Sequence, residues 1–191
     1  MAYVSLASGA NLEAATKERI LADAPWVAES LAAATQAVRN ACGWHVGPPR
    51  VETDLRLDGS GSRIQRLPSL HVTAIATLND NGVDLIPDVD FDWSENGVLE
   101  RGRWSRKRRG ITVTFTHGHA LEGIPDVVNL VTVIAARAVA SARSGGAVRE
   151  QAGTNSVELA KMGGSVSALI NATVLPHELT LLEPYILPQE A

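Results

Sequence analysis

The segment Ile111-Thr112-Val113-Thr114-Phe115-Thr116 begins the stretch that decides the fold. Between this segment and Ala140 the spacing of the apolar residues changes once. Apolar and polar residues alternate here, which predicts a β-strand with one buried face. The alternation ends at His117-Gly118-His119, and Pro125 then opens a run that is apolar over most of a helical circumference. We therefore expect a strand that leads into a long buried helix within residues 121–146.

Two helices are expected before residue 47. The second has an apolar face at helical spacing, made of Val27, Leu31, Ala34, Val38 and Cys42. Gly43 follows, as a left-handed cap at the end of a helix would. A weaker helix is predicted over residues 11–21, with Asn11 as its N-cap. Residues 1–46 are thus predicted to form the N-terminal helices.

Short strands separated by turn signals are expected from Val51 to Thr116. The bend Gly47-Pro48-Pro49 closes the helical part, and Asn81-Gly82 is the strongest two-residue hairpin signal in the chain. Asn96-Gly97 repeats that signal. This spacing is typical of a small antiparallel sheet or an open barrel. We interpret residues 47–120 as an inserted β module.

The C-terminal part, residues 147–191, is predicted to be an extended arm with one short helix near residues 176–183. Residues 147–174 show no convincing period. The arm ends in the apolar residues Tyr185, Ile186 and Leu187 between two prolines, which we expect to dock on the chain's own core or on a neighbour. The predicted fold class is α+β, mainly a helical bundle with the β module inserted and the arm extended.

Composition narrows the classes of protein. A chain of 191 residues is expected to form one domain with tails. Cys42 is the only cysteine, so no intrachain disulfide can form and Cys-rich zinc sites are excluded. The N-terminus has no basic region before an apolar one, and polar residues interrupt the apolar run at 127–140. We expect neither a signal peptide nor a membrane span.

One basic cluster stands out against an acidic remainder. The formal charge is −4, yet residues 101–109 alone carry +6, from Arg101, Arg103, Arg106, Lys107, Arg108 and Arg109. Such a cluster attracts polyphosphate, and Trp104 within it can stack or pack. It is equally typical of a solvated hairpin tip, or of a patch that pairs with acidic residues of an adjacent subunit. These readings stay open at this stage.

The sequence contains candidate metal ligands and catalytic residues, but each set lacks members that such a site needs. Asp88-Val89-Asp90-Phe91-Asp92 looks like a calcium ladder, but Trp93 and Leu99 stand where such a loop needs Gly and Glu. His117 and His119 would share one side of an extended segment, but two nitrogens do not make a catalytic zinc site. We expect no metal, no cofactor and no enzymatic activity; a hydrolase that uses the two histidines and a carboxylate is an alternative.

The order of several short motifs resembles a known family. The motifs are Ala-Cys-Gly-Trp at 41–44, Leu67-Pro68 before Val72-Thr73, Asp92-Trp93 before Asn96-Gly97-Val98-Leu99, Thr116-His117-Gly118, Ile124-Pro125-Asp126-Val127, and Glu178 and Leu182 before Tyr185. Over residues 20–187 this order is similar to that of the head-to-tail adaptor (connector) proteins of long-tailed bacteriophages. The length of the β insertion and the basic cluster depart from the minimal family pattern.

The resemblance implies a structural virion protein without enzymatic activity or cofactor. It implies a homo-oligomeric ring of about twelve copies between the portal and the tail, around the channel for double-stranded DNA. The partners would be the portal protein, a tail-side connector or stopper protein and the DNA, with no membrane. The location would be the virion neck, after assembly in the host cytoplasm.

The resemblance also implies a role for each of the two candidate sites. Residues 101–109 would contact DNA or the adjacent subunit, and Tyr185, Ile186 and Leu187 would dock on the portal or another partner. The alternative function is a stand-alone nucleic-acid-binding module that uses residues 101–109.

Overall fold

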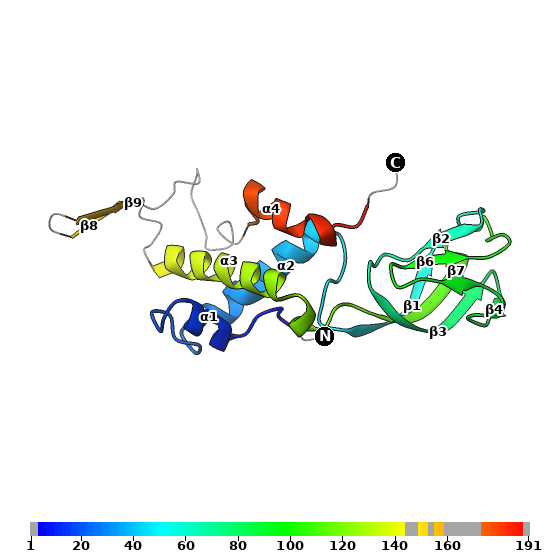
Figure 1. The fold of residues 1–191 in the computed structure, drawn as a ribbon, viewed down its shortest axis with the longest axis horizontal. Helices are drawn as coiled ribbons and strands as arrows, with labels where there is room; N and C mark the ends of the chain where they lie inside the picture. Colours follow the sequence, from blue (N-terminus) through cyan, green and yellow to red (C-terminus); the bar gives the residue numbers. More distant parts are fainter. Residues whose placement is uncertain (1–3, 144–148, 153–154, 159–172, 189–191) are drawn as a thin grey trace. The chain divides into compact units, whose positions relative to one another are not determined.

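The computed structural model describes residues 4–143, 149–152, 155–158 and 173–188 (Figure 1). The chain divides into two compact units. The helical unit comprises Met1–Ala41 with Pro125–Glu183, and the β unit comprises Cys42–Ile124 with Pro184–Ala191. The chain therefore passes between the units three times.

The fold is mixed, and the expectation of a mainly helical bundle is wrong. Within the described residues, four α-helices are accompanied by seven strands that form two antiparallel sheets in the β unit. These strands enclose a hydrophobic cluster of their own. The β segment is therefore a second structural unit with its own core, and it is not an appendage of a helical one.

The helical unit is built around α3 (Pro125–Arg143). One stripe of this helix is buried at helical spacing: Val127, Leu130, Val131, Ile134, Ala135, Ala138 and Val139. α1 (Gly9–Ala15) and α4 (Pro176–Leu182) pack against α3. α2 (Val27–Cys42) ends as predicted, with Gly43 in the left-handed region at φ +79°.

The first helix begins earlier than expected and ends sooner. Ser8 is the N-cap of α1, and its Oγ accepts a hydrogen bond from the Asn11 backbone N–H at 3.2 Å. Asn11 Oδ1 in turn accepts from the Ser8 backbone N–H at 2.9 Å. Asn11 is therefore the third helical residue of a capping box, and its prediction as the N-cap is wrong.

An ion pair between the partly exposed Arg137 and the buried Glu178 fastens α4 to α3. Arg137 donates to both carboxylate oxygens of Glu178, at 2.8 and 3.2 Å, and to the carbonyl oxygen of Thr173 at 2.8 Å. The Leu175 backbone N–H also donates to Glu178, at 2.7 Å. Burial alone would raise the pKa of Glu178, but these hydrogen bonds outweigh it and lower the pKa below its usual value.

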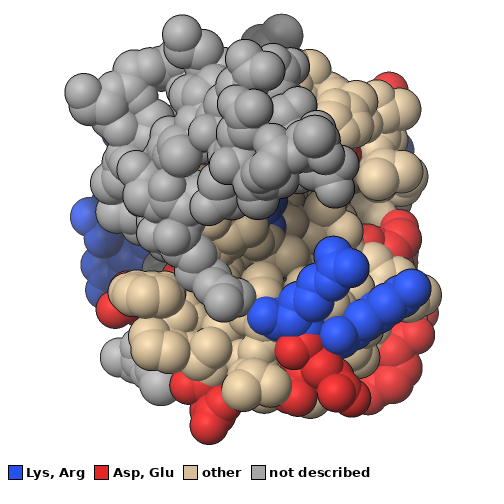
Figure 2. All heavy atoms as spheres, turned by 90° about the vertical axis from the view of Figure 1, so that its left-hand side faces the viewer, with Lys and Arg blue, Asp and Glu red and all other residues tan. Residues whose placement is uncertain are grey.

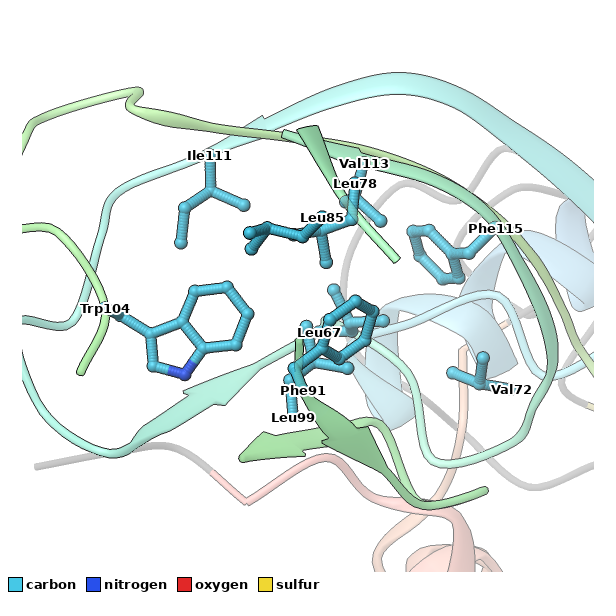
Figure 3. Close-up of a cluster of buried hydrophobic side chains, with 10 residues drawn as sticks. All are labelled: Leu67, Val72, Leu78, Leu85, Phe91, Leu99, Trp104, Ile111, Val113 and Phe115. Atoms are coloured by element: carbon cyan, nitrogen blue, oxygen red, sulfur yellow. The ribbon is translucent and has the colours of Figure 1, made fainter. Parts of the chain in front are cut away.

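The β unit is a two-layer sandwich. The first sheet has the order β1-β7-β3-β4: Arg50–Leu57, Ile111–His117, Val72–Asp80 and Val83–Leu85. The second has the order β2-β6-β5: Ile64–Arg66, Val98–Glu100 and Asp92–Trp93. Side chains from both layers meet in the core drawn in Figure 3. Asn81-Gly82 joins β3 to β4 as the predicted hairpin turn, because Asp80 pairs with Val83.

Part of the expected arm is described. β8 (Arg149–Ala152) and β9 (Asn155–Glu158) pair antiparallel, and α4 leads into the short 3-10 helix η3 (Glu183–Tyr185). Residues 147–148, 153–154, 159–172 and 189–191 of the expected arm lie outside the described residues. A second 3-10 helix, η1 (Leu121–Gly123), lies between β7 and α3.

The central place of α3 gives a testable prediction. Ile134 is fully buried, whereas Val133 beside it is 54% exposed. Ile134→Asp should bury an unpaired charge and cost several kcal/mol of stability, on the order of 4 kcal/mol or more. Thermal melting followed by circular dichroism measures the loss, with Val133→Asp as the matched control. Equal melting temperatures for the two variants would contradict the packing described here.

Candidate functional site

The basic cluster lies in the loop that connects β6 to β7, and a buried carboxylate holds this loop. Asp80, 7% exposed at the end of β3, accepts from Arg101 Nη1 at 3.2 Å and from the Ser105 backbone N–H at 3.1 Å, both through Oδ2. Arg101 is therefore committed to an internal ion pair. We name residues 101–110 the basic loop.

Trp104 anchors the middle of the basic loop in the sandwich core (Figure 3). Its side chain is 1% exposed, its ring lies 6.1 Å from that of Phe91, and its indole N–H donates to the Arg63 carbonyl at 3.1 Å. The guanidinium of Arg101 lies 5.3 Å from the ring centroid. A base cannot stack on this ring while the loop keeps its conformation.

The turn between β1 and β2 supports the other side of the basic loop. The Gly59 and Gly61 backbone N–H groups donate to the carbonyls of Lys107 and Ser105, at 3.0 and 2.9 Å. The Arg109 backbone N–H donates to Asp58 Oδ1 at 2.6 Å. A Cβ atom at Gly59 would collide with the Ser105 carbonyl oxygen, so only glycine permits this approach.

The predicted cluster thus separates into two groups. Arg101 and Lys107 are tied to the β unit, the latter through a 3.0 Å hydrogen bond from Nζ to Asn81 Oδ1. Arg103 donates through Nε to the Gly61 carbonyl at 3.3 Å. The exposed guanidinium groups of Arg106, Arg108 and Arg109 make no ion pair within the described part of the chain. We call these three the free arginines.

The predicted docking residues lie against the β unit. The Trp44 indole N–H donates to the carbonyl of Tyr185 at 2.7 Å, and the Leu187 backbone N–H donates to the carbonyl of Cys42 at 2.8 Å. The Ile186 side chain is 37% exposed. The structure therefore brings this segment to the residues that follow α2, far away from it in the sequence.

The two histidines singled out from the sequence lie in a larger group. His117, 3% exposed at the end of β7, and His119 are joined by His45 and His71. Burial lowers the pKa of His117 to about 4, helped by the nearby Arg50 and His45. Among the described residues, no three His, Cys, Asp or Glu side chains are placed to share a metal ion.

The face of the molecule drawn in Figure 2 carries side chains of both charges. On the face drawn in Figure 2, basic side chains lie beside acidic ones, and no broad surface of one sign is visible among the described residues. Within the same described part of the chain, no helix is both long and apolar enough to cross a bilayer. The basic loop holds six of the 17 Lys and Arg residues within nine positions, which makes it a candidate contact surface.

Known proteins match this chain by structure and not by sequence. No model of a known protein family matches the chain, and no curated protein matches it by sequence. A solved chain from the neck of a native GTA particle, computed with C12 symmetry, matches with a TM-score of 0.53 and 13% identity, over 96% of this chain and 92% of that one. A chain from the neck of an empty GTA particle, computed with C6 symmetry, matches with the same score and identity over 96% and 90%. At this identity the likeness shows a shared fold.

The division of the basic loop predicts unequal effects of two similar substitutions. Arg101→Ala leaves the buried carboxylate of Asp80 without its cation and should cost about 1–3 kcal/mol. Arg108→Ala removes the same charge from an exposed side chain and should change stability by less than about 0.5 kcal/mol. Urea unfolding of both variants measures the difference. Equal losses would mean that Arg101 does not anchor the loop.

Proposed function

We propose that this protein is a structural component of a virion neck, a head-to-tail adaptor that assembles as a ring between the portal and the tail. The observation that carries the proposal is the shared fold with GTA neck chains over 96% of this chain. The order of sequence motifs similar to that of phage adaptors supports it independently. The role is structural rather than catalytic.

A ring of identical subunits needs two different surfaces on each copy, because its contacts are heterologous. The free arginines offer one such surface, since they are exposed and presented by a loop fixed at Asp80 and Trp104. The remainder of the chain is acidic, with −10 outside residues 101–109 against a total of −4. Contact between the basic loop and an acidic face of the next copy is the arrangement we favour.

A second candidate role for the same loop is contact with the DNA that passes through the channel. Arginine on a rigid loop can bind phosphate without reading bases, which a conduit requires. The alternative of a stand-alone module for single strands is less favoured. Such modules stack bases on exposed aromatic rings, and Trp104 is buried.

The ring assignment predicts a change of assembly in a loop variant. Replacing the free arginines together, Arg106→Ser, Arg108→Ser and Arg109→Ser, should break the ring and leave the subunit folded, because exposed charges add little to a subunit's own stability. Native mass spectrometry, alone and with a portal ring, measures the assembly. A matched control removes three exposed cations elsewhere on the β unit, by Arg56→Ser, Arg63→Ser and Arg66→Ser.

The same preparations distinguish the two roles of the loop. If the loop contacts DNA, the triple variant keeps its ring and loses duplex binding, which in the parent falls steeply with salt and shows no sequence preference. An unchanged ring with unchanged DNA binding would remove the basic loop from both roles. A parent protein that stays monomeric even with a portal ring would remove the adaptor assignment itself.

The C-terminal segment gives a separate prediction. Deleting residues 184–191 should keep the helical unit folded, because its core lies elsewhere in the chain, and should weaken attachment to the portal. Circular dichroism measures the fold and co-sedimentation with portal rings measures attachment. Undiminished attachment of the truncated protein would show that Tyr185, Ile186 and Leu187 are not the docking residues.

A further inference from the structure

Four of the five histidines meet in the β unit, although they are far apart in the sequence. His71 stacks on His119 with ring centroids 4.1 Å apart and planes 10° from parallel. His45 lies 5.5 Å from His117. The Trp44 ring joins the two pairs, at 6.4 Å from His117 and 5.8 Å from His119. We call these four side chains the histidine cluster.

The C-terminal segment closes over this cluster. The Tyr185 ring meets His119 edge to face at 5.9 Å, and the Tyr185 carbonyl accepts the 2.7 Å hydrogen bond from the Trp44 indole. Two residues further, the Leu187 backbone N–H donates to the carbonyl of Cys42 at the end of α2. The segment therefore contacts the histidine cluster directly at His119 and also contacts Trp44, which lies beside both histidine pairs.

The surroundings of His117 favour its neutral form. Arg50 Nε–H points at His117 Nε2 at 3.4 Å, so that nitrogen acts as the acceptor and the proton belongs on Nδ1. A second proton on Nε2 would face the guanidinium. Glu52 favours the charged imidazole, since Oε2 lies 3.8 Å from Nε2, but that oxygen already pairs with Arg50 at 2.7 Å.

His45 carries a fixed proton of its own. Its Nε2 lies 2.6 Å from the Pro48 carbonyl oxygen, which can only accept, so Nε2 must be the donor. In the described part of the chain, the ionisable neighbours of the cluster include Arg50 and Glu52 of β1 and the Tyr185 phenol. The Arg50 cation lies against His117, so a proton added to His117 meets like charge.

We propose that the histidine cluster is an acid-sensitive latch for the C-terminal segment. With neutral imidazoles, the segment from Tyr185 to Leu187 is held on Trp44 and Cys42. Protonation gives His45 and His117 positive charges that repel each other and Arg50. This repulsion displaces the neighbouring Trp44 ring, so the segment is released while the sandwich stays folded. The latch is a property of the β unit and does not rest on the neck assignment.

The direction of the effect follows from linkage. Burial, Arg50 and His45 lower the pKa of His117 from 6.5 to about 4 in the closed state. Exposure of His117 on release of the segment would therefore make the open state bind protons more readily. Closure is therefore strongest above pH 6.5 and is lost as the pH falls toward 4. If opening restores the ordinary pKa of His117, the opening equilibrium rises about thirtyfold between pH 8 and pH 5.

The test is an NMR titration of the full-length, 15N-labelled chain from pH 8 to pH 5. Two signals report the latch: the Trp44 indole N–H, assigned with Trp44→Phe, and the protection of the Leu187 amide relative to its intrinsic exchange rate at each pH. We expect the indole signal to move to its solvent-exposed position and the Leu187 protection to fall by about tenfold to thirtyfold. The Val113 amide in the core of β7 should keep its protection.

Substitutions identify the titrating groups. His117→Gln and His119→Gln, each taken alone, should shift or weaken the transition, because glutamine keeps polarity without titrating. His177→Gln is the matched control, since His177 lies on α4 outside the cluster. Unchanged Leu187 protection down to pH 5 would overturn the proposal. Simultaneous loss of the Leu187 and Val113 signals would also overturn it, because it would mean global acid unfolding rather than a latch.

Discussion

The β unit depends on the burial of one face of β7 in the core of the sandwich. Ile111, Val113 and Phe115 are completely buried, and β7 is bonded to β1 on one edge and to β3 on the other. Burying side chains of this size stabilises by about 1.5–3 kcal/mol each. This central strand fixes the end of the basic loop at its first residue, Ile111, and the histidine cluster at its last residue, His117.

The strand and the helix that follow one another at residues 111–143 were predictable, since each buries one face and shows its period directly. The proportion of helix to strand could not be predicted, because most strands of the sandwich are two or three residues long and are too short to show an alternation of apolar and polar residues. Their partners are distant: β2 pairs with β6 more than thirty residues away. A short-range pattern therefore indicates that strands exist but not that they close around their own core.

The candidate site shows the same limit in its charges. In the sequence, six cations and one tryptophan form a single group. In the fold, Arg101 pairs with Asp80 and Trp104 is buried in the core. Nothing local marks Asp80, since its partner lies 21 positions later. The histidine cluster was equally hidden in the sequence. His71 is brought to His119 by the pairing of β3 with β7, and His45 is brought there by the hydrogen bond from the His119 backbone N–H to the Val46 carbonyl at 2.7 Å. Local spacing therefore located the surface but not the groups that position it.

The rigidity of the basic loop bears on which partner it serves. A loop whose backbone is fixed at both sides loses little backbone entropy on binding, so the remaining ordering cost is that of the exposed arginine side chains. With three phosphate contacts per subunit, the logarithm of DNA affinity would fall with the logarithm of salt with a slope of about −2.7 per subunit. A ring of such loops would hold a duplex firmly, whereas a channel must let it pass. An acidic neighbour gains from the same rigidity without that conflict, and this favours the contact between copies.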